Sequence, residues 1–184
     1  SGRRLTMAVN VSARQLADPA FPEVVRNALV ANELEADQVA LEFTESALIA
    51  ANPITERVLG DLTDLGVQIG LDDFGTGFSS LAYLKRLPID FLKIDRSFVS
   101  GLDDPEDGDE GRDDTAIVTG TVALAHSLGL QVVAEGVETE SQLRSLRRLR
   151  CDLAQGFHFS EPVTDAEFDR FLGRRFSEAP VSPN

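Results

Sequence analysis

The stretch from Val67 to Gly77 reads VQIGLDDFGTG and joins a short apolar run to two acids and a glycine-rich loop. Its first part, Val67–Leu71, has the length and apolar character of a buried β-strand. Asp72 and Asp73 follow where the strand would end, and the glycines after them allow the backbone to bend sharply over a ligand. We therefore interpret this stretch as a strand whose carboxyl end carries acids of a functional site.

Short β-rich runs of this kind alternate with amphipathic helical patterns along the chain. Strands are predicted at Leu5–Val11, Val39–Phe43, Val67–Leu71, Phe91–Ile94, Gln131–Ala134 and Leu153–Phe159. Helices are predicted at Pro22–Asn32, Ile54–Leu65, Ser79–Leu87, Thr115–Leu128, Glu140–Leu149 and Asp165–Leu172. The alternation favours an α/β fold with a parallel sheet, either doubly wound or closed into a barrel.

Local signals mark several of the predicted helix ends. Asn52 precedes a proline and suits an N-cap, and Thr139 with Gln142 matches a capping box. Gly66 and Gly129 stand just after helical patterns, where a left-handed residue is favoured. These signals support the predicted order of elements.

Length and composition indicate one globular domain over residues 1–184, since 42% of the chain is hydrophobic. No apolar run approaches the roughly 20 residues needed to cross a bilayer, and no signal-peptide core follows Ser1–Arg4. Cys151 is the single cysteine, so the chain cannot form an internal disulfide. We expect a cytoplasmic segment without membrane contact, although a longer parent protein can be anchored through other regions.

The formal net charge is −14, from 31 acidic residues against 17 Lys and Arg. Such a chain should repel long nucleic acids, and a phosphate-bearing substrate would need divalent cations to neutralise its charge. Acids are densest in Gly101–Asp114, GLDDPEDGDEGRDD, which we interpret as a solvated loop. Its spacing does not match the calcium-binding loop of EF-hands.

Polar residues stand at or just after the end of each predicted strand. In a barrel these ends meet on one face, which is the active-site face of such folds. The residues are Asn10, Glu42, Glu45, Asp72, Asp73, Lys93, Asp95, Glu135, Glu138 and Gln155. Each alone could be an exposed loop residue, but gathering so many acids costs stability unless a cation offsets their charge.

Oxygen ligands without His or Cys clusters favour Mg²⁺ or Mn²⁺ over Zn²⁺. His126 and His158 are expected to be structural rather than ligands. Two short motifs are misleading. The DFG at Asp73–Gly75 has no kinase catalytic loop upstream, and the G-x-G at Gly75–Gly77 lacks the third glycine of a dinucleotide fingerprint.

Six blocks in order along the chain resemble the signature blocks of EAL domains. They are VNVSARQL (Val9–Leu16), LEFTES (Leu41–Ser46), DDFGTGFSSL (Asp72–Leu81), LKIDRSFV (Leu92–Val99), AEGVET (Ala134–Thr139) and QGFHFSEP (Gln155–Pro162). The resemblance implies a TIM-like (β/α)₈ barrel that hydrolyses cyclic di-GMP to linear pGpG in bacterial signalling. It also implies two Mg²⁺ or Mn²⁺ ions at the barrel mouth.

The resemblance further implies a role for each polar residue at the strand ends. Asn10, Glu42 and Asp72 would bind the first metal, Asp73 and Asp95 the second, and Glu135 would be a ligand or base. Glu45 would hold the loop that contains Gly75, Thr76 and Gly77, while Glu138 and Gln155 would complete the rim. Lys93 would orient or activate the attacking water, and we favour orientation because acidic neighbours should keep it charged.

Two parts expected of an EAL domain are not found in this sequence: the N-terminal Glu-Ala-Leu block and the strand before it. We therefore expect about two strands of the barrel to be missing from this sequence. Two alternatives stay open: an inactive EAL fragment that binds cyclic di-GMP or a protein partner as a receptor, and an unrelated metal-dependent barrel hydrolase. The retained acids favour an enzyme as the parent. A homodimer, and sensory or GGDEF-type domains in a longer parent, are the expected protein partners.

Overall fold

A computed structural model of the chain describes residues 5–49, 52–75, 84–102 and 108–168. These residues form one sheet of six parallel strands, each paired with the next in chain order. The strands are β1 (Met7–Val11), β2 (Val39–Thr44), β3 (Gln68–Phe74), β4 (Phe91–Ile94), β5 (Gln131–Ala134) and β6 (Leu153–Ala154). Consecutive order without reversal excludes the doubly wound alternative, whose strand order reverses at a switch point.

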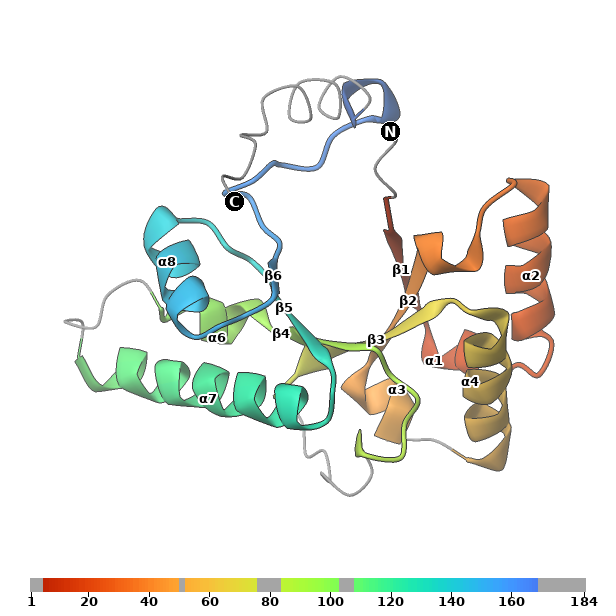
Figure 1. The fold of residues 1–184 in the computed structure, drawn as a ribbon, viewed down its shortest axis with the longest axis horizontal. Helices are drawn as coiled ribbons and strands as arrows, with labels where there is room; N and C mark the ends of the chain where they lie inside the picture. The colour runs from red at the N-terminus through yellow and green to blue at the C-terminus, as the bar shows by residue number, and fades with distance from the viewer. Residues whose placement is uncertain (1–4, 50–51, 76–83, 103–107, 169–184) are drawn as a thin grey trace, which may run out of the picture.

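The sheet curves as an arc of a barrel, with β1 and β6 at its two edges and the helices on its outer side (Figure 1). The helices are α1 (Ala13–Leu16), α2 (Phe21–Ala31), α3 (Glu45–Ile49), α4 (Pro53–Leu65), α6 (Arg96–Ser100), α7 (Gly108–Ser127) and α8 (Glu140–Arg148), with a 3₁₀ turn at Ala36–Gln38. The predicted fold class, an incomplete α/β barrel, is confirmed. No helix in the described ranges is both long and apolar enough to cross a membrane.

The predicted helix caps are confirmed. The Asn52 side chain accepts hydrogen bonds from the first turn of α4, at 2.8 Å from Ile54 N, and Thr139 and Gln142 form a capping box on α8. Gly66 and Gly129 adopt positive φ angles of 88° and 77° after α4 and α7. Each signal therefore acts where the sequence predicts it.

Several predicted boundaries were wrong. Strand β3 runs to Phe74 and does not end at Leu71, so Asp72 and Asp73 lie within the strand. The last strand covers only Leu153–Ala154, because the chain then turns with hydrogen bonds from Phe159 N and Ser160 N to Gly156 O. Helix α7 begins at Gly108, so the second half of the predicted loop Gly101–Asp114 is helical. Acids are favoured in the first turn of a helix because its N-terminus carries partial positive charge. The predicted helices Ser79–Leu87 and Asp165–Leu172 lie mostly outside the described residues, although residues 165–168 are helical.

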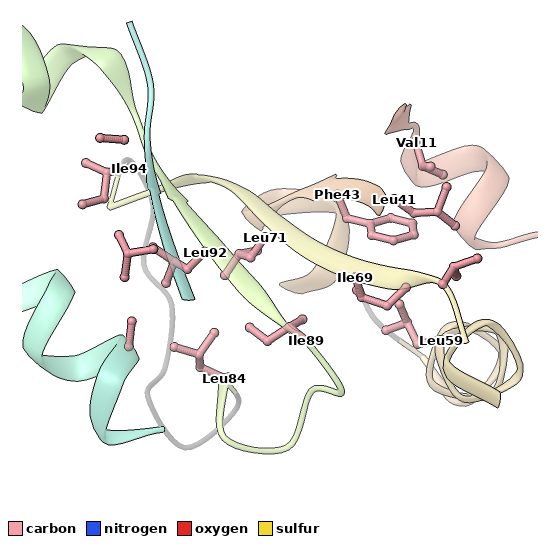
Figure 2. Packing of buried hydrophobic residues seen from close by; sticks show 14 of the residues in the cluster. Val11, Leu41, Phe43, Leu59, Ile69, Leu71, Leu84, Ile89, Leu92 and Ile94 are labelled. Carbon is pink, nitrogen blue, oxygen red and sulfur yellow. The ribbon is translucent and has the colours of Figure 1, made fainter. Parts of the chain in front are cut away.

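Alternation along the strands separates the hydrophobic core from the barrel interior. Ile69 and Leu71 of β3, and Leu92 of β4, point toward the helices and are 0–1% exposed (Figure 2). The residues between them point inward. There, Gly70 pairs with Phe91 of β4, and a Cβ on Gly70 would overlap the Phe91 ring. The core therefore lies between sheet and helices, and the inner face is left for the polar residues of the site.

Candidate active site

The inner-facing positions of β2, β3 and β4 bring polar side chains together toward the carboxyl ends of the strands. Glu42 precedes buried Phe43, Asp72 follows buried Leu71, and Lys93 lies between buried Leu92 and Ile94. Because side chains alternate across a strand, burial of the apolar neighbours on the outer face turns these three polar groups inward. The hydrophobic pattern itself therefore positions the site.

Lys93 lies at the centre of this group. Its Nζ lies 2.5 Å from Glu135 Oε1, 2.7 Å from Glu42 Oε2 and 3.3 Å from Asp72 Oδ1. Burial lowers the pKa of Lys93, but its hydrogen bonds to Glu135 and Glu42 outweigh burial and hold the pKa above its usual value. Lys93 is thus a positive charge at neutral pH, as its acidic neighbours led us to expect.

A break in strand pairing places two consecutive acids beside Glu135. The β3–β4 register shifts between Leu71 and Phe74, and Asp73 adopts a left-handed φ of 55°. Consecutive side chains of a regular strand point to opposite faces. Here, however, carboxylate oxygens of Asp72, Asp73 and Glu135 all lie within 4.8 Å of one another.

This three-carboxylate cluster suits a divalent cation. Burial and the charges of Asp72 and Asp95 raise the pKa of Asp73. Burial also raises the pKa of Glu135, against the opposing effect of Lys93. At both carboxylates, burial and the neighbouring acids together thus outweigh the opposing effect of Lys93 on the pKa. Three hard oxygen ligands around one point fit Mg²⁺, Mn²⁺ or Ca²⁺.

Three of the predicted ligands lie outside the cluster: Glu42, which contacts Lys93, and Asn10 and Asp95. Asn10 is exposed and is the register partner of Glu42 on β1. Asp95 caps helix α6, where its Oδ1 accepts hydrogen bonds from Ser97 N at 3.0 Å and Ser97 Oγ at 2.5 Å. The bond from the Ser97 hydroxyl lowers the pKa of Asp95. Metal binding by any of the three stays a prediction.

Glu45 is almost fully buried, with 3% of its surface exposed. Its Oε2 accepts a hydrogen bond from Gly75 N at 3.4 Å, and its Oε1 has no hydrogen-bond partner in the described part of the chain. Gly75 has a φ of 99°, which a side chain would strain. Glu45 thus contacts the start of the loop that it was predicted to hold, while Thr76 and Gly77 lie outside the described residues.

A pocket of about 230 Å³ opens beside the cluster. It is lined by the predicted rim residues Glu138 and Gln155, together with Arg96, Glu135, Gly136, Gly156 and Phe157. Sequence reasoning missed Arg96 and Phe157. Arg96 directly follows Asp95 in one signature block and Phe157 follows Gln155–Gly156 in another, so position beside predicted site residues was the available signal.

The two histidines lie outside the carboxylate cluster. His126 Nε2 is 2.9 Å from Asp152 Oδ2, which also accepts a hydrogen bond from Val132 N at the start of β5. His158 Nε2 is 3.3 Å from Glu140 Oε2 at the start of α8. Each pair links a helix to a loop beside β6, which agrees with the structural role predicted for these histidines.

A parallel barrel arc with carboxylates and a buried lysine at its mouth is typical of an α/β barrel domain with a candidate metal site. Within that class, the EAL domain family matches residues 1–162, and the chain belongs to it. Cyclic di-GMP phosphodiesterase NbdA of Pseudomonas aeruginosa is 46% identical over 178 residues, which cover 96% of this chain and 22% of NbdA. The chain thus spans about a fifth of that relative's length.

Solved structures share the fold. The PaMucR phosphodiesterase in complex with c-di-GMP is 45% identical, with a TM-score of 0.81 over 89% of this chain and 64% of that one. Klebsiella pneumoniae BlrP1, in a manganese and cy-diGMP complex, is 33% identical, with a TM-score of 0.76 over 86% of this chain and 39% of that one. Similarity at this level supports the barrel fold.

Proposed function

We propose that the domain to which this chain belongs hydrolyses cyclic di-GMP to linear pGpG with the help of Mg²⁺ or Mn²⁺. The observation that carries the proposal is buried Lys93 in contact with Glu42 and Glu135, beside the cluster that Asp72 and Asp73 complete. A receptor has no need of an acid-paired lysine at its ligand site, whereas a hydrolase must position water. The relatives named for this activity support the same conclusion.

Asp72, Asp73 and Glu135 would hold a metal ion, and Glu42, Asn10 and Asp95 are the nearest candidates to complete two sites. Divalent cations bound there would neutralise the phosphate oxygens and favour deprotonation of water. The protein's contribution is to present converging carboxylates from strands that the sheet holds rigidly.

Hydrolysis requires that a water oxygen bond to phosphorus while the bond from phosphorus to the ribose 3′ oxygen breaks. The proton of that water needs an acceptor, and the departing oxygen needs a proton. Glu135, a carboxylate of the cluster that lies 2.5 Å from Lys93 Nζ, would serve either as a ligand of the metal or as the acceptor of this proton. Lys93, which stays charged, is suited to orient the water and to stabilise developing negative charge.

The proposal is tested by incubating the full-length protein that contains this chain with cyclic di-GMP and separating the products. We expect pGpG with Mg²⁺ or Mn²⁺, none in excess chelator, and inhibition by Ca²⁺, which binds at longer distances and activates water less well. Undiminished turnover in chelator would contradict the proposal. Tight binding of cyclic di-GMP without turnover in any metal would instead indicate a receptor.

A further inference from the structure

Arg96 is the first residue of α6 and lies over the turn that follows the candidate base Glu135. The turn residue Gly136 has a φ of 66°, and a Cβ on it would lie only 2.5 Å from the Arg96 Cβ. The stem of Arg96 therefore packs directly on the backbone of the site. Its exposed guanidinium makes no ion pair or hydrogen bond with side chains of the described ranges, although its charge helps lower the pKa of Asp95.

The residues that line the pocket beside Arg96 suit a flat ring. Two of its lining residues, Gly136 and Gly156, have no side chain, and Phe157 offers a ring that is 63% exposed. A volume of about 230 Å³ is below the range of roughly 300–1,000 Å³ typical for drug-sized ligands. The pocket thus suits one heterocycle of a dinucleotide rather than the whole molecule.

We propose that Arg96 is a specificity-determining residue that recognises a guanine base in this pocket. The inference rests on the proposed function. An arginine fork donates two hydrogen bonds to guanine O6 and N7, and an exposed aromatic ring such as Phe157 stacks on a base. Adenine presents an amino donor where guanine has O6, so Arg96 would lose one of the two bonds and face a second donor.

A base contact fits Arg96 better than a phosphate contact. Lys93 and the carboxylates that would hold cations lie together at the strand ends, and they account for the charges that a phosphodiester needs. Arg96 lines the adjacent pocket instead, with the carboxylate of Glu138 and the amide of Gln155 as further polar groups. These additional groups can serve the remaining polar edge of a bound base.

The test compares the binding of pGpG and pApA to the full-length protein in Mn²⁺. Linear dinucleotides are used so that hydrolysis of a cyclic substrate does not interfere with the binding measurement. Arg96→Ala should weaken pGpG binding roughly 5- to 150-fold, the value of one bidentate contact, and leave pApA nearly unchanged. Arg96→Lys keeps the stem on Gly136 and should retain part of the preference. Arg57→Ala, on the outer helix α4, is the matched control and should change neither.

If Arg96→Ala weakens the binding of pGpG and pApA equally, the inference is overturned in favour of a phosphate contact. If the binding of pGpG is unchanged, the inference is overturned outright. If Arg96→Ala fails to fold, Arg96→Lys decides instead: a reduced preference for pGpG over pApA supports the inference, and an unchanged preference overturns it. Hydrolysis of cyclic di-GMP is measured separately. A protein that shows Arg96-dependent guanine preference without turnover would refute the proposed hydrolase while supporting the role of Arg96.

Discussion

Lys93 Nζ and Glu135 Oε1 lie 2.5 Å apart, although Lys93 lies in β4 and Glu135 directly follows β5, with the whole of α6 and α7 between them in sequence. The Lys93 side chain is only 5% exposed, and Glu42, its second partner, is 7% exposed. Charges withdrawn from water to this degree are stable only if they are paired. The lysine therefore stabilises the arrangement of acids as well as serving the proposed chemistry.

Replacing Lys93 with methionine should strongly destabilise the protein in the absence of metal. The variant leaves Glu42 and Glu135 without their cation, and breaking a buried pair typically costs about 3–5 kcal/mol. Urea unfolding in chelator measures the loss. Adding Glu42→Gln to Lys93→Met should recover part of it, because one of the unpaired charges is removed. Equal stability of Lys93→Met and wild type in chelator would contradict the central role of this lysine.

Asp73→Asn should stabilise the metal-free protein at neutral pH. The folded pKa of Asp73 lies above 3.8, so the folded state binds its proton more tightly than the unfolded state, and stability falls as pH rises through that window. Asparagine carries no charge, so it avoids this loss of stability, and it tolerates the left-handed backbone. Solvent screening limits the gain to about 1 kcal/mol or less, roughly 2–4 °C in Tm.

Thermal unfolding in chelator across pH tests the Asp73 prediction. The advantage of Asp73→Asn should disappear below pH 3.8, where the carboxyl is protonated in both states. Mn²⁺ should raise the Tm of wild type more than that of the variant. A variant that is less stable than wild type at neutral pH without metal would show that Asp73 is not under electrostatic strain.

Sequence patterns predicted the order of the strands and the helices α2, α4 and α8 well, because burial and caps act locally. Strands β4 and β5 have the predicted bounds, Phe91–Ile94 and Gln131–Ala134. The short helices α1, α3 and α6 were not predicted. Four or five residues are too few to show a helical period, and the Ser12–Gln15 capping box on α1, which has the same spacing as Thr139–Gln142, was overlooked.

The candidate site was predictable where its residues stand at the carboxyl ends of predicted strands. The carboxyl ends of parallel strands meet on one face of the barrel, so Glu42, Asp72 and Glu135 come together there whatever the exact geometry of each strand. The left-handed backbone at Asp73 was not predictable, because it depends on a register shift between two strands. Nor was the cap made by Asp95, since the same carboxylate suits a helix and a metal equally well.

Glu135→Gln should reduce kcat for cyclic di-GMP far more than it raises KM. The carboxylate contacts Lys93 and belongs to the three-carboxylate cluster, so its charge matters most in the transition state. We expect a loss of about 10²–10⁴-fold in kcat at saturating Mn²⁺, the range for a general acid or base. Glu138→Gln, at the rim of the same pocket, should have a smaller effect. A change in KM alone would assign Glu135 to binding.

Gly70→Ala should destabilise the barrel from inside. The new methyl group would overlap the ring of Phe91 on the neighbouring strand, and overpacking of this kind typically costs about 1–3 kcal/mol. Gly60→Ala and Gly120→Ala are matched controls, because these helical glycines have no atom within 4 Å of the added Cβ. Both should stabilise the protein by about 0.5–1 kcal/mol. Chemical denaturation that ranks all three variants alike would contradict the inward packing of Phe91.

The edges of the sheet should make the 184-residue chain self-associate. Apolar side chains at both edges are exposed: Met7 by 60% and Val9 by 45% on β1, and Leu153 by 53% on β6. An apolar pocket of about 630 Å³ lies between Met7 and the segment that follows β6. Unpaired backbone groups and exposed apolar residues at strand edges favour pairing with another chain.

Sedimentation or light scattering over a range of concentrations tests this prediction. Met7→Lys combined with Leu153→Lys should shift the 184-residue chain toward monomer, since charges at edge strands oppose pairing. Val30→Lys on α2 is the control, because that side chain is 73% exposed but lies away from the sheet edges, and it should leave the assembly state unchanged. A monodisperse monomer of the unmodified chain at high concentration would show that the edges are protected by other means.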